Sequence, residues 1–181
     1  EEGFLPEGLL NYLALLGWSM GEDREFFSKE QLAAAFSLDR VSANPARFDL
    51  KKCTAINADW IRALPADELA RRVQAVLVQR GVLLDPVPDG DAATLTRAIP
   101  LVQERMETLG QAVGMLGFLF ADEVAYEEDA LKGLPADAVE VLDASVAALE
   151  PVEDFTPDAI QQALSTKLVD ELELKPRVAY G

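Results

Sequence analysis

The sequence predicts an all-α protein, and three observations lead to this prediction. Apolar residues recur at intervals of three and four along several segments, which is the spacing of one helix face. Prolines or cap-forming side chains precede these segments, and glycines follow several of them. No stretch of alternating apolar and polar residues is long enough to predict a substantial sheet. With 181 residues, 50% of them hydrophobic, the chain can build one good core or two small ones.

The first two predicted helices have well-defined starting residues. Pro6 opens a segment whose leucines recur at helical spacing, and Gly17 closes it. Ser28 is followed three residues later by Gln31, which is the pattern of a capping box at a helix N-terminus. The sequence therefore predicts a helix over 6–17 and a second helix that begins after Ser28.

The segment that follows predicts a turn and two short helices. The turn is expected at Asn44-Pro45, since the residue before a proline is disfavoured in a helix. Asp49 can cap a short helix over 50–56, and Asn57 can cap another that reaches residue 64.

A longer helix is predicted to begin after Pro65 and to end at Gly81. The apolar stripe of this helix consists of Leu69, Val73, Val76 and Leu77. The stretch from Asp85 to Asp91 contains two prolines and a glycine, so it is predicted to be a loop. Asp91 is available there as the cap of the next helix.

The remaining segments predict several more helices. Residues 92 to about 120 are helical in character, in two pieces around the glycines of 110–117. Pro135 starts another helix, which has four apolar residues on one face: Val139, Leu142, Val146 and Leu149. The pair Thr156-Pro157 forms an N-cap and a first-turn proline for a helix that runs to about Leu172.

The composition excludes several kinds of chemistry. The chain has 32 acidic and 16 basic residues, a formal net charge of -16, and no histidine. Imidazole therefore cannot serve as a base, a nucleophile or a metal ligand. The single cysteine, Cys53, excludes an intrachain disulfide and a cysteine-rich zinc site, and it is expected to be a buried thiol. Trp18 and Trp60 are expected in the core.

No segment predicts membrane insertion or secretion. No apolar run approaches the roughly 20 residues that span a bilayer, and the longest, Leu9 to Trp18, is interrupted by Asn11 and Gly17. The first residues, Glu1 and Glu2, do not resemble a signal peptide and indicate a cut end. We therefore expect a cytoplasmic protein in a reducing compartment.

Motifs for catalysis or metal binding are absent from the sequence or incomplete. No glycine-rich loop has the spacing that cradles phosphates. If Asp85 began a calcium loop, its third and twelfth positions would be Val87 and Thr96, so a solvated loop is expected instead. The run Glu127-Glu128-Asp129 is expected to be solvated surface. These residues alone predict a binding or scaffolding protein without catalytic or metal-ligating residues.

Four segments together resemble one known family. They are GFLPEGLLNYLALLGWS at 3–19, DREFFS at 23–28, RFDLKKCTAINADWIR at 47–62 and ERMETL at 104–109. They resemble bacterial glutamyl-tRNA synthetases, in which the first segment follows the KMSKS-type loop. The third is similar to the family's F-D-L-x-K-L-x-W-x-N-x-x-Y-I-R element, with Cys53, Ala55 and Trp60 in place of its leucine, tryptophan and tyrosine.

The resemblance covers the whole chain, strongly over residues 3–62 and more loosely in the last third. It implies a helical stem-contact segment over 1–64, followed by an α-helical cage that binds the anticodon. The cage would consist of a first subdomain over 65–121 and a second over 122–181, incomplete at its C-terminus. The run from Lys175 to Gly181 resembles the segment just before one of the family's anticodon-contacting arginines.

The resemblance also implies that ATP and magnesium act in a catalytic domain upstream of Glu1. The family's H-I-G-H-like and K-M-S-K-S-like motifs do not occur in this chain. The chain itself is therefore expected to be non-catalytic and to hold no cofactor. The parent protein would be a class I aminoacyl-tRNA synthetase that ligates glutamate to its tRNA.

The matched positions imply which residues contact tRNA. Arg105 falls on the residue with which the family inspects the third anticodon base, and Thr108 belongs to the same R-x-x-T-L element. Lys52, Asn57 and Arg62 fall in the stem-contact element and are expected to contact the RNA backbone. For Asn57 the alternative role of a helix N-cap stays open.

The expected partner is glutamate tRNA, with no DNA and no membrane, and the protein is expected to be a monomer. The net negative charge does not exclude tRNA binding, because 12 of the 16 basic residues precede residue 111 and can line one face. The competing hypothesis is an acidic protein-interaction or adaptor module that docks through residues 122–181. A titration with glutamate tRNA and with an anticodon-changed version discriminates between the two.

Overall fold

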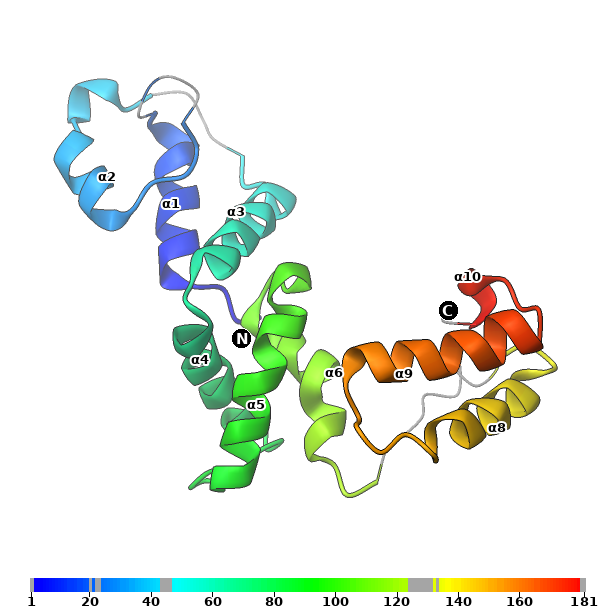
Figure 1. Cartoon of the computed structure of the whole chain (residues 1–181). Coiled ribbons are helices and arrows are strands. Elements are labelled where there is room, and N and C mark those ends of the chain that lie inside the picture. The colour runs from blue at the N-terminus through cyan, green and yellow to red at the C-terminus, as the bar shows by residue number, and fades with distance from the viewer. Residues whose placement is uncertain are drawn as a thin grey trace. The chain divides into compact units, whose positions relative to one another are not determined.

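The computed structural model describes residues 2–19, 21, 24–42, 47–123, 132 and 134–179, and their regular secondary structure is helical (Figure 1). No strand occurs in these ranges, which confirms the all-α prediction. Within the same ranges, no helix is both long and apolar enough to cross a membrane. The chain divides into two compact units, Glu1–Val124 and Ala125–Gly181. The finer division of the first unit at residue 64 stays a prediction.

The first two helices have the predicted starting residues. Helix α1 (Pro6–Gly17) begins with its proline and ends at its glycine. Helix α2 (Lys29–Ala35) has the predicted capping box, in which the Ser28 hydroxyl accepts a hydrogen bond from the Gln31 N–H. The Gln31 side-chain carbonyl in turn accepts one from the Ser28 N–H. A short 3-10 helix, η1 (Leu38–Arg40), follows.

Helix α3 (Leu50–Ala63) is one continuous helix that packs against α1 (Figure 1). Asp49 caps it as predicted, since its carboxylate accepts a hydrogen bond from the Lys52 N–H at 3.1 Å. The predicted break at Asn57 is wrong, because Asn57 lies in the middle of α3 and its buried side chain bonds to groups outside the helix. The turn predicted at Asn44-Pro45 lies outside the described residues.

Helices α4 (Ala66–Gln79) and α5 (Asp89–Val102) pack side by side and supply much of the core of the first unit (Figure 1). Gly81 follows α4 with a φ of 73°, a conformation that favours glycine. Helix α5 begins two residues before the predicted cap Asp91, because Pro88 takes the N-cap position. The fully buried side chains of these two helices are Leu69, Val73, Leu77, Leu95 and Ile99.

The chain after α5 bends earlier than predicted, at residues 106–108 instead of within 110–117. The bend has extended backbone at Met106 and Thr108, because the residues that follow pair with the N-terminal segment. Two N–H groups donate to N-terminal carbonyls: Leu109 to Gly3 at 2.9 Å and Gly110 to Glu2 at 3.3 Å. The short helices around the bend are η2 (Gln103–Arg105), η3 (Leu109–Gln111), α6 (Ala112–Leu116) and η4 (Gly117–Phe120).

A group of ion pairs ties α1 to α4. The Arg72 guanidinium donates to both carboxylate oxygens of Glu7, at 2.9 and 3.0 Å, and to Glu68 at 2.7 Å. These three side chains are only a quarter to a third exposed. The hydrogen bonds from Arg72 lower the pKa of the Glu7 carboxyl, and Glu7 and Glu68 together raise the pKa of Arg72.

The second unit contains α8 (Ala138–Leu149), α9 (Pro157–Leu164), a π-helical turn η5 (Ser165–Glu171) and α10 (Pro176–Ala179). Thr156 caps α9 as predicted, and η5 continues that helix to the predicted end near Leu172. The predicted apolar face of α8 is more than half exposed at Val139, Leu142 and Val146. The acidic run Glu127-Glu128-Asp129 lies outside the described residues.

Candidate nucleic-acid interface

Arg105 is the last residue of η2 and is exposed to solvent. The turn that carries it is anchored from within: the Gln103 side-chain amide donates to the carbonyls of Ile61 and Leu64, both at 2.9 Å. Met106, the next residue, is fully buried. Among the described residues, no carboxylate pairs with the Arg105 guanidinium. A free guanidinium is therefore presented on a fixed piece of backbone.

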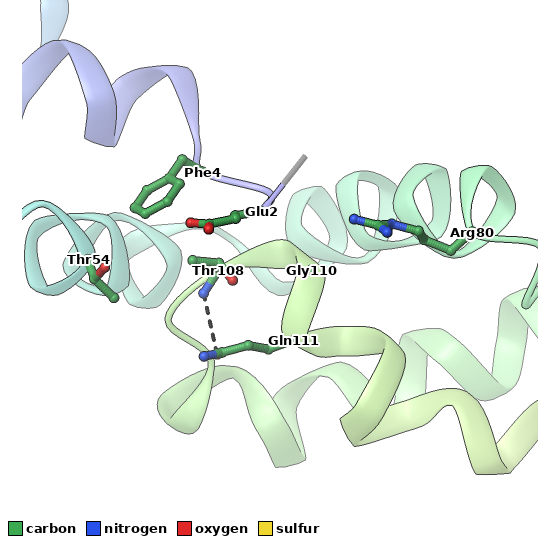
Figure 2. Close-up of a pocket in the computed structure, with 7 residues that line it drawn as sticks. All are labelled: Glu2, Phe4, Thr54, Arg80, Thr108, Gly110 and Gln111. Atoms are coloured by element: carbon green, nitrogen blue, oxygen red, sulfur yellow. Dashed lines mark hydrogen bonds between the residues drawn. The ribbon is translucent and has the colours of Figure 1, made fainter. Parts of the chain in front are cut away.

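Thr108 lies three residues further on, half-buried, at the start of η3. The Gln111 side-chain carbonyl accepts hydrogen bonds from the N–H groups of Glu107, at 2.7 Å, and Thr108, at 3.4 Å. Figure 2 shows the second of these bonds as a dashed line. Leu109 is buried in the core of the first unit. Arg105 and Thr108 thus lie on one short loop that is held on both sides by buried side chains.

Thr108 also lines an open pocket of about 450 Å³ (Figure 2). The residues that line it are Glu2, Phe4, Thr54, Arg80, Thr108, Gly110 and Gln111. Glu2 and Phe4 come from the segment before α1, and Arg80 comes from the end of α4. Two opposite charges and several hydrogen-bonding groups give this hollow a polar character without a pair of carboxylates suited to acid–base catalysis.

Lys52 and Arg62 are exposed on α3, and each pairs with a nearby carboxylate. Lys52 Nζ lies 2.5 Å from Glu25 Oε1, and an Arg62 guanidinium nitrogen lies 2.5 Å from Asp59 Oδ1. Exposed ion pairs of this kind contribute only about 0–1 kcal/mol. Both cations can therefore exchange their carboxylate for a phosphate at little cost.

Asn57 differs from the other predicted contact residues, because its side chain is fully buried. Its Oδ1 accepts a hydrogen bond from the Leu5 N–H at 2.7 Å, and its Nδ2 donates to the Glu107 carbonyl at 2.6 Å. The structure therefore gives Asn57 an internal role in place of the predicted contact with the RNA backbone. Turning this amide outward to contact RNA would break both bonds and leave the Leu5 N–H and the Glu107 carbonyl without their partner.

Two cations that sequence reasoning did not select lie at the start of α3. Arg47 and Lys51, together with Phe48, Asp49 and Leu50, line a shallow hollow of about 450 Å³. Phe48 and Leu50 are more than half exposed there. Among the described residues, neither Arg47 nor Lys51 forms an ion pair. The signal was available in the sequence, since both residues belong to the RFDLKK part of the resembling segment.

Reactive groups are few in the described part of the chain. Cys53 is buried as predicted, and desolvation raises the pKa of its thiol, which disfavours the nucleophilic thiolate. No group of three or more potential metal-ligating side chains was found among the described residues. The chemistry that this surface can perform is recognition by charge, hydrogen bonds and stacking.

Two family models match the chain. The model described as "Anticodon binding domain" matches residues 68–180, and "tRNA synthetases class I (E and Q), catalytic domain" matches residues 1–55. The first match includes Arg105, Thr108 and the helices of the second unit. The second match covers most of the predicted stem-contact segment. This segment is therefore similar to part of the family's catalytic-domain model.

Curated relatives and solved structures agree with these matches. Glutamate–tRNA ligase of Kocuria rhizophila is 50% identical over 183 residues, which are 100% of this chain and 36% of that protein. The enzyme of Leifsonia xyli is 49% identical over 185 residues, with 100% of this chain and 38% of that protein covered. The chain thus spans little more than a third of these relatives.

A solved structure of similar fold is the crystal structure of a glutamate tRNA ligase from Elizabethkingia meningosepticum in complex with its amino acid. It has a TM-score of 0.75 and 25% identity, over 99% of this chain and 34% of that one. The glutamate–tRNA synthetase structure from Elizabethkingia anophelis has a TM-score of 0.72 and 25% identity, over 97% and 33%. The chain therefore belongs to the anticodon-binding domain family, and over its whole length it is similar to part of bacterial glutamate–tRNA ligases.

Proposed function

We propose that this chain grasps glutamate tRNA, at its anticodon and along the inner side of the L-shaped molecule, within an enzyme that ligates glutamate to that tRNA using ATP. The proposal rests on the family match, on the relatives' names and on the cations of the first unit. The partner is an RNA and not DNA or a membrane. The protein acts as a cytoplasmic monomer.

The observation that carries this proposal is the presentation of Arg105. Bases in an anticodon loop can unstack, and proteins recognise them by stacking and by hydrogen bonds to their exposed edges. A guanidinium supplies a planar fork that donates two parallel bonds or stacks on a base. Because the turn around Arg105 is anchored by Gln103 and Met106, the backbone that carries the fork is fixed before RNA binds.

The other cations hold the RNA without recognising its sequence. Lys52 and Arg62 are the backbone contacts that the family resemblance implies, and we add Arg47 and Lys51 at the start of α3. Contacts to phosphates fix the register and orientation of a nucleic acid. Thr108 joins Arg105 on the anticodon side, since both lie on the same loop.

ATP and magnesium belong to the catalytic part of the enzyme in this proposal. The described residues offer no glycine-rich loop for phosphates and no cluster of carboxylates suited to magnesium. Adenylate and ester formation are thus assigned in this proposal to the catalytic part of the enzyme.

The test is anticodon discrimination by the full-length enzyme with Arg105→Gln. Glutamine keeps a hydrogen-bonding side chain but loses the fork and the charge. We expect the preference between tRNAs that differ in the third anticodon base to fall by about tenfold. Arg97→Gln is the matched control, because Arg97 is an exposed arginine of α5 without an ion pair in the described part of the chain. An unchanged preference in the Arg105 variant would refute the role of Arg105.

The second candidate function is the acidic adaptor module. The observation that favours it is the exposed face of α8, where Val139, Leu142 and Val146 are 69%, 58% and 58% exposed. Apolar residues at this spacing can receive a partner helix. The adaptor hypothesis predicts that substitutions on α8 weaken a protein complex and leave tRNA affinity unchanged, whereas substitutions of the α3 cations do the reverse.

A further inference from the structure

One side chain joins three separate segments of the first unit. Asn57 projects from α3, accepts from the N–H of Leu5 just before α1, and donates to the carbonyl of Glu107 in the loop after η2. Both bonds are short, at 2.7 and 2.6 Å, and the side chain has no exposed surface. Hydrogen bonds at such a dry position hold their partners firmly, because a lost partner leaves a buried polar group unsatisfied.

The surroundings of Asn57 leave little freedom. Gly8 packs so closely on it that a Cβ at that position would lie 2.6 Å from Asn57 Oδ1. Next to it, the backbone of Gly3 pairs with that of Leu109 at 2.9 Å. Gly3 has a φ of 82°, and a Cβ there would lie 2.5 Å from the Gly110 nitrogen. The N-terminal segment and the loop that follows Arg105 are therefore fitted to each other through glycines.

The first unit contains a second buried asparagine of the same kind. Asn11 Oδ1 accepts from the Phe27 N–H and from the Trp60 indole N–H, and its Nδ2 donates to the Glu25 carbonyl. Its side chain is 1% exposed. Asn11 thus satisfies the same chemistry as Asn57 but bonds to α3 and to the segment before α2, not to the Arg105 loop.

We propose that Asn57 is a positioning residue for anticodon recognition. It fixes the carbonyl of Glu107, and through it the loop on which Arg105 and Thr108 meet the RNA. Through its other bond, accepted from the Leu5 N–H, Asn57 also connects this loop to the segment at residues 2–5, which matches the catalytic-domain family. The proposal rests on the function proposed above for Arg105.

The experiment compares Asn57→Leu with Asn11→Leu in the full-length enzyme. Leucine approximates the shape of asparagine and removes the two side-chain hydrogen bonds of Asn57 or the three of Asn11, so each variant loses a buried amide with its bonds. The measurement is a discrimination ratio, which is the dissociation constant for a tRNA changed at the third anticodon base divided by that for glutamate tRNA. We expect the ratio to fall by about tenfold in the Asn57 variant and to stay at the parental value in the Asn11 variant.

A parental ratio in a folded Asn57 variant, or an equal fall in the Asn11 variant, would overturn the proposal. If the Asn57 variant does not fold, Gln111→Ala decides, because it loosens the same loop from its exposed side by removing the acceptor for Glu107 and Thr108. A fall of the ratio in that variant supports the proposal and a parental ratio overturns it. Arg105→Gln separates the role of Arg105 from the positioning role of Asn57. If Arg105→Gln leaves the ratio unchanged, the proposed function fails. If Arg105→Gln lowers the ratio and the Asn57 variant does not, only the positioning role fails.

Discussion

Arg72 holds two carboxylates at once, and this makes it the main polar link between α1 and α4. Its guanidinium is bidentate on Glu7 and makes a third bond to Glu68. Planar bidentate pairs of this kind are stronger than single contacts, and partial burial reduces their screening by water. The Glu7 carboxylate is therefore stabilised in the folded protein relative to the unfolded chain.

Glu7→Gln is predicted to lower the stability of the chain by about 0.5–1 kcal/mol at pH 7, because Glu7 is about a third exposed and the pair is partly screened. The pKa of Glu7 in the folded state lies below its ordinary value of 4.5. The stabilisation is thus complete above that value and is lost as the pH falls through the lower folded pKa. Urea unfolding between pH 7 and pH 3 measures it.

In that series the difference between parent and variant should shrink toward zero at the acid end. Glu104→Gln is the control, since Glu104 is exposed and has no ion pair in the described ranges. A difference that stays constant over the whole range would show that the charge of Glu7 is not what stabilises the fold.

Single residues were also where sequence reasoning was least complete. The positions of Arg105 and Thr108 on a common loop follow from their spacing, and of the two Arg105 is exposed and Thr108 half-buried. The internal role of Asn57 could not be predicted, because it depends on Leu5 and Glu107, which lie about 50 residues away on either side. Local patterns contain no information on such contacts.

At the scale of elements, the approach of α1 to α3 depends on a small residue at Gly8. A Cβ there would lie 2.6 Å from Asn57 Oδ1 and 3.0 Å from the Asn57 Cα, and the backbone of α3 cannot move aside easily. Gly17, at the other end of α1, faces open space, because a Cβ added to it would meet no atom within 4 Å. One helix thus offers two glycines in opposite surroundings.

We predict that Gly8→Ala destabilises the protein by about 2 kcal/mol through overpacking. Gly17→Ala should be neutral or stabilising by up to about 1 kcal/mol, since alanine favours helix over glycine. Thermal unfolding of the two variants beside the parent measures the contrast. Equal stability of the two variants would mean that α1 and α3 do not pack as closely as described.

Most helix boundaries were predictable because they depend on neighbouring residues. Ser28, Asp49 and Thr156 cap their helices as their sequence contexts predict. The break at 106–108 was not predictable, because it arises from backbone pairing with residues 2 and 3. The start of α5 was missed by three residues, because Pro88 took the cap position in place of Asp91.

At the scale of the whole chain, the net charge is -16. RNA binding by such a chain requires that a small number of cations make the contacts to the phosphates. Basic side chains of the first unit that pair with carboxylates include Lys52, Arg62, Arg71 and Arg72. The remaining acidic surface repels RNA that is not held by specific contacts.

We therefore predict that the logarithm of tRNA affinity falls with the logarithm of salt concentration with a slope no steeper than about -5. A binding titration over roughly 50 to 300 mM salt measures it, with an unrelated tRNA as the control. A steeper slope, or equal binding of both RNAs, would contradict this picture of the surface.

The fold class could be predicted from the sequence more completely than the arrangement of the site residues. Helical periodicity and the absence of alternating segments are properties of the sequence alone, and they were enough for the all-α prediction. The exposure of the α8 face was not predictable, because spacing shows which residues share a face but not whether another element covers it.

The most direct test of the central claim is a titration of the chain with glutamate tRNA and with the same tRNA carrying a changed anticodon. If the chain grasps tRNA and inspects its anticodon, the unchanged tRNA binds saturably and about tenfold more tightly than the changed one. Equal affinity for the two, or no binding of either, would contradict the proposed function.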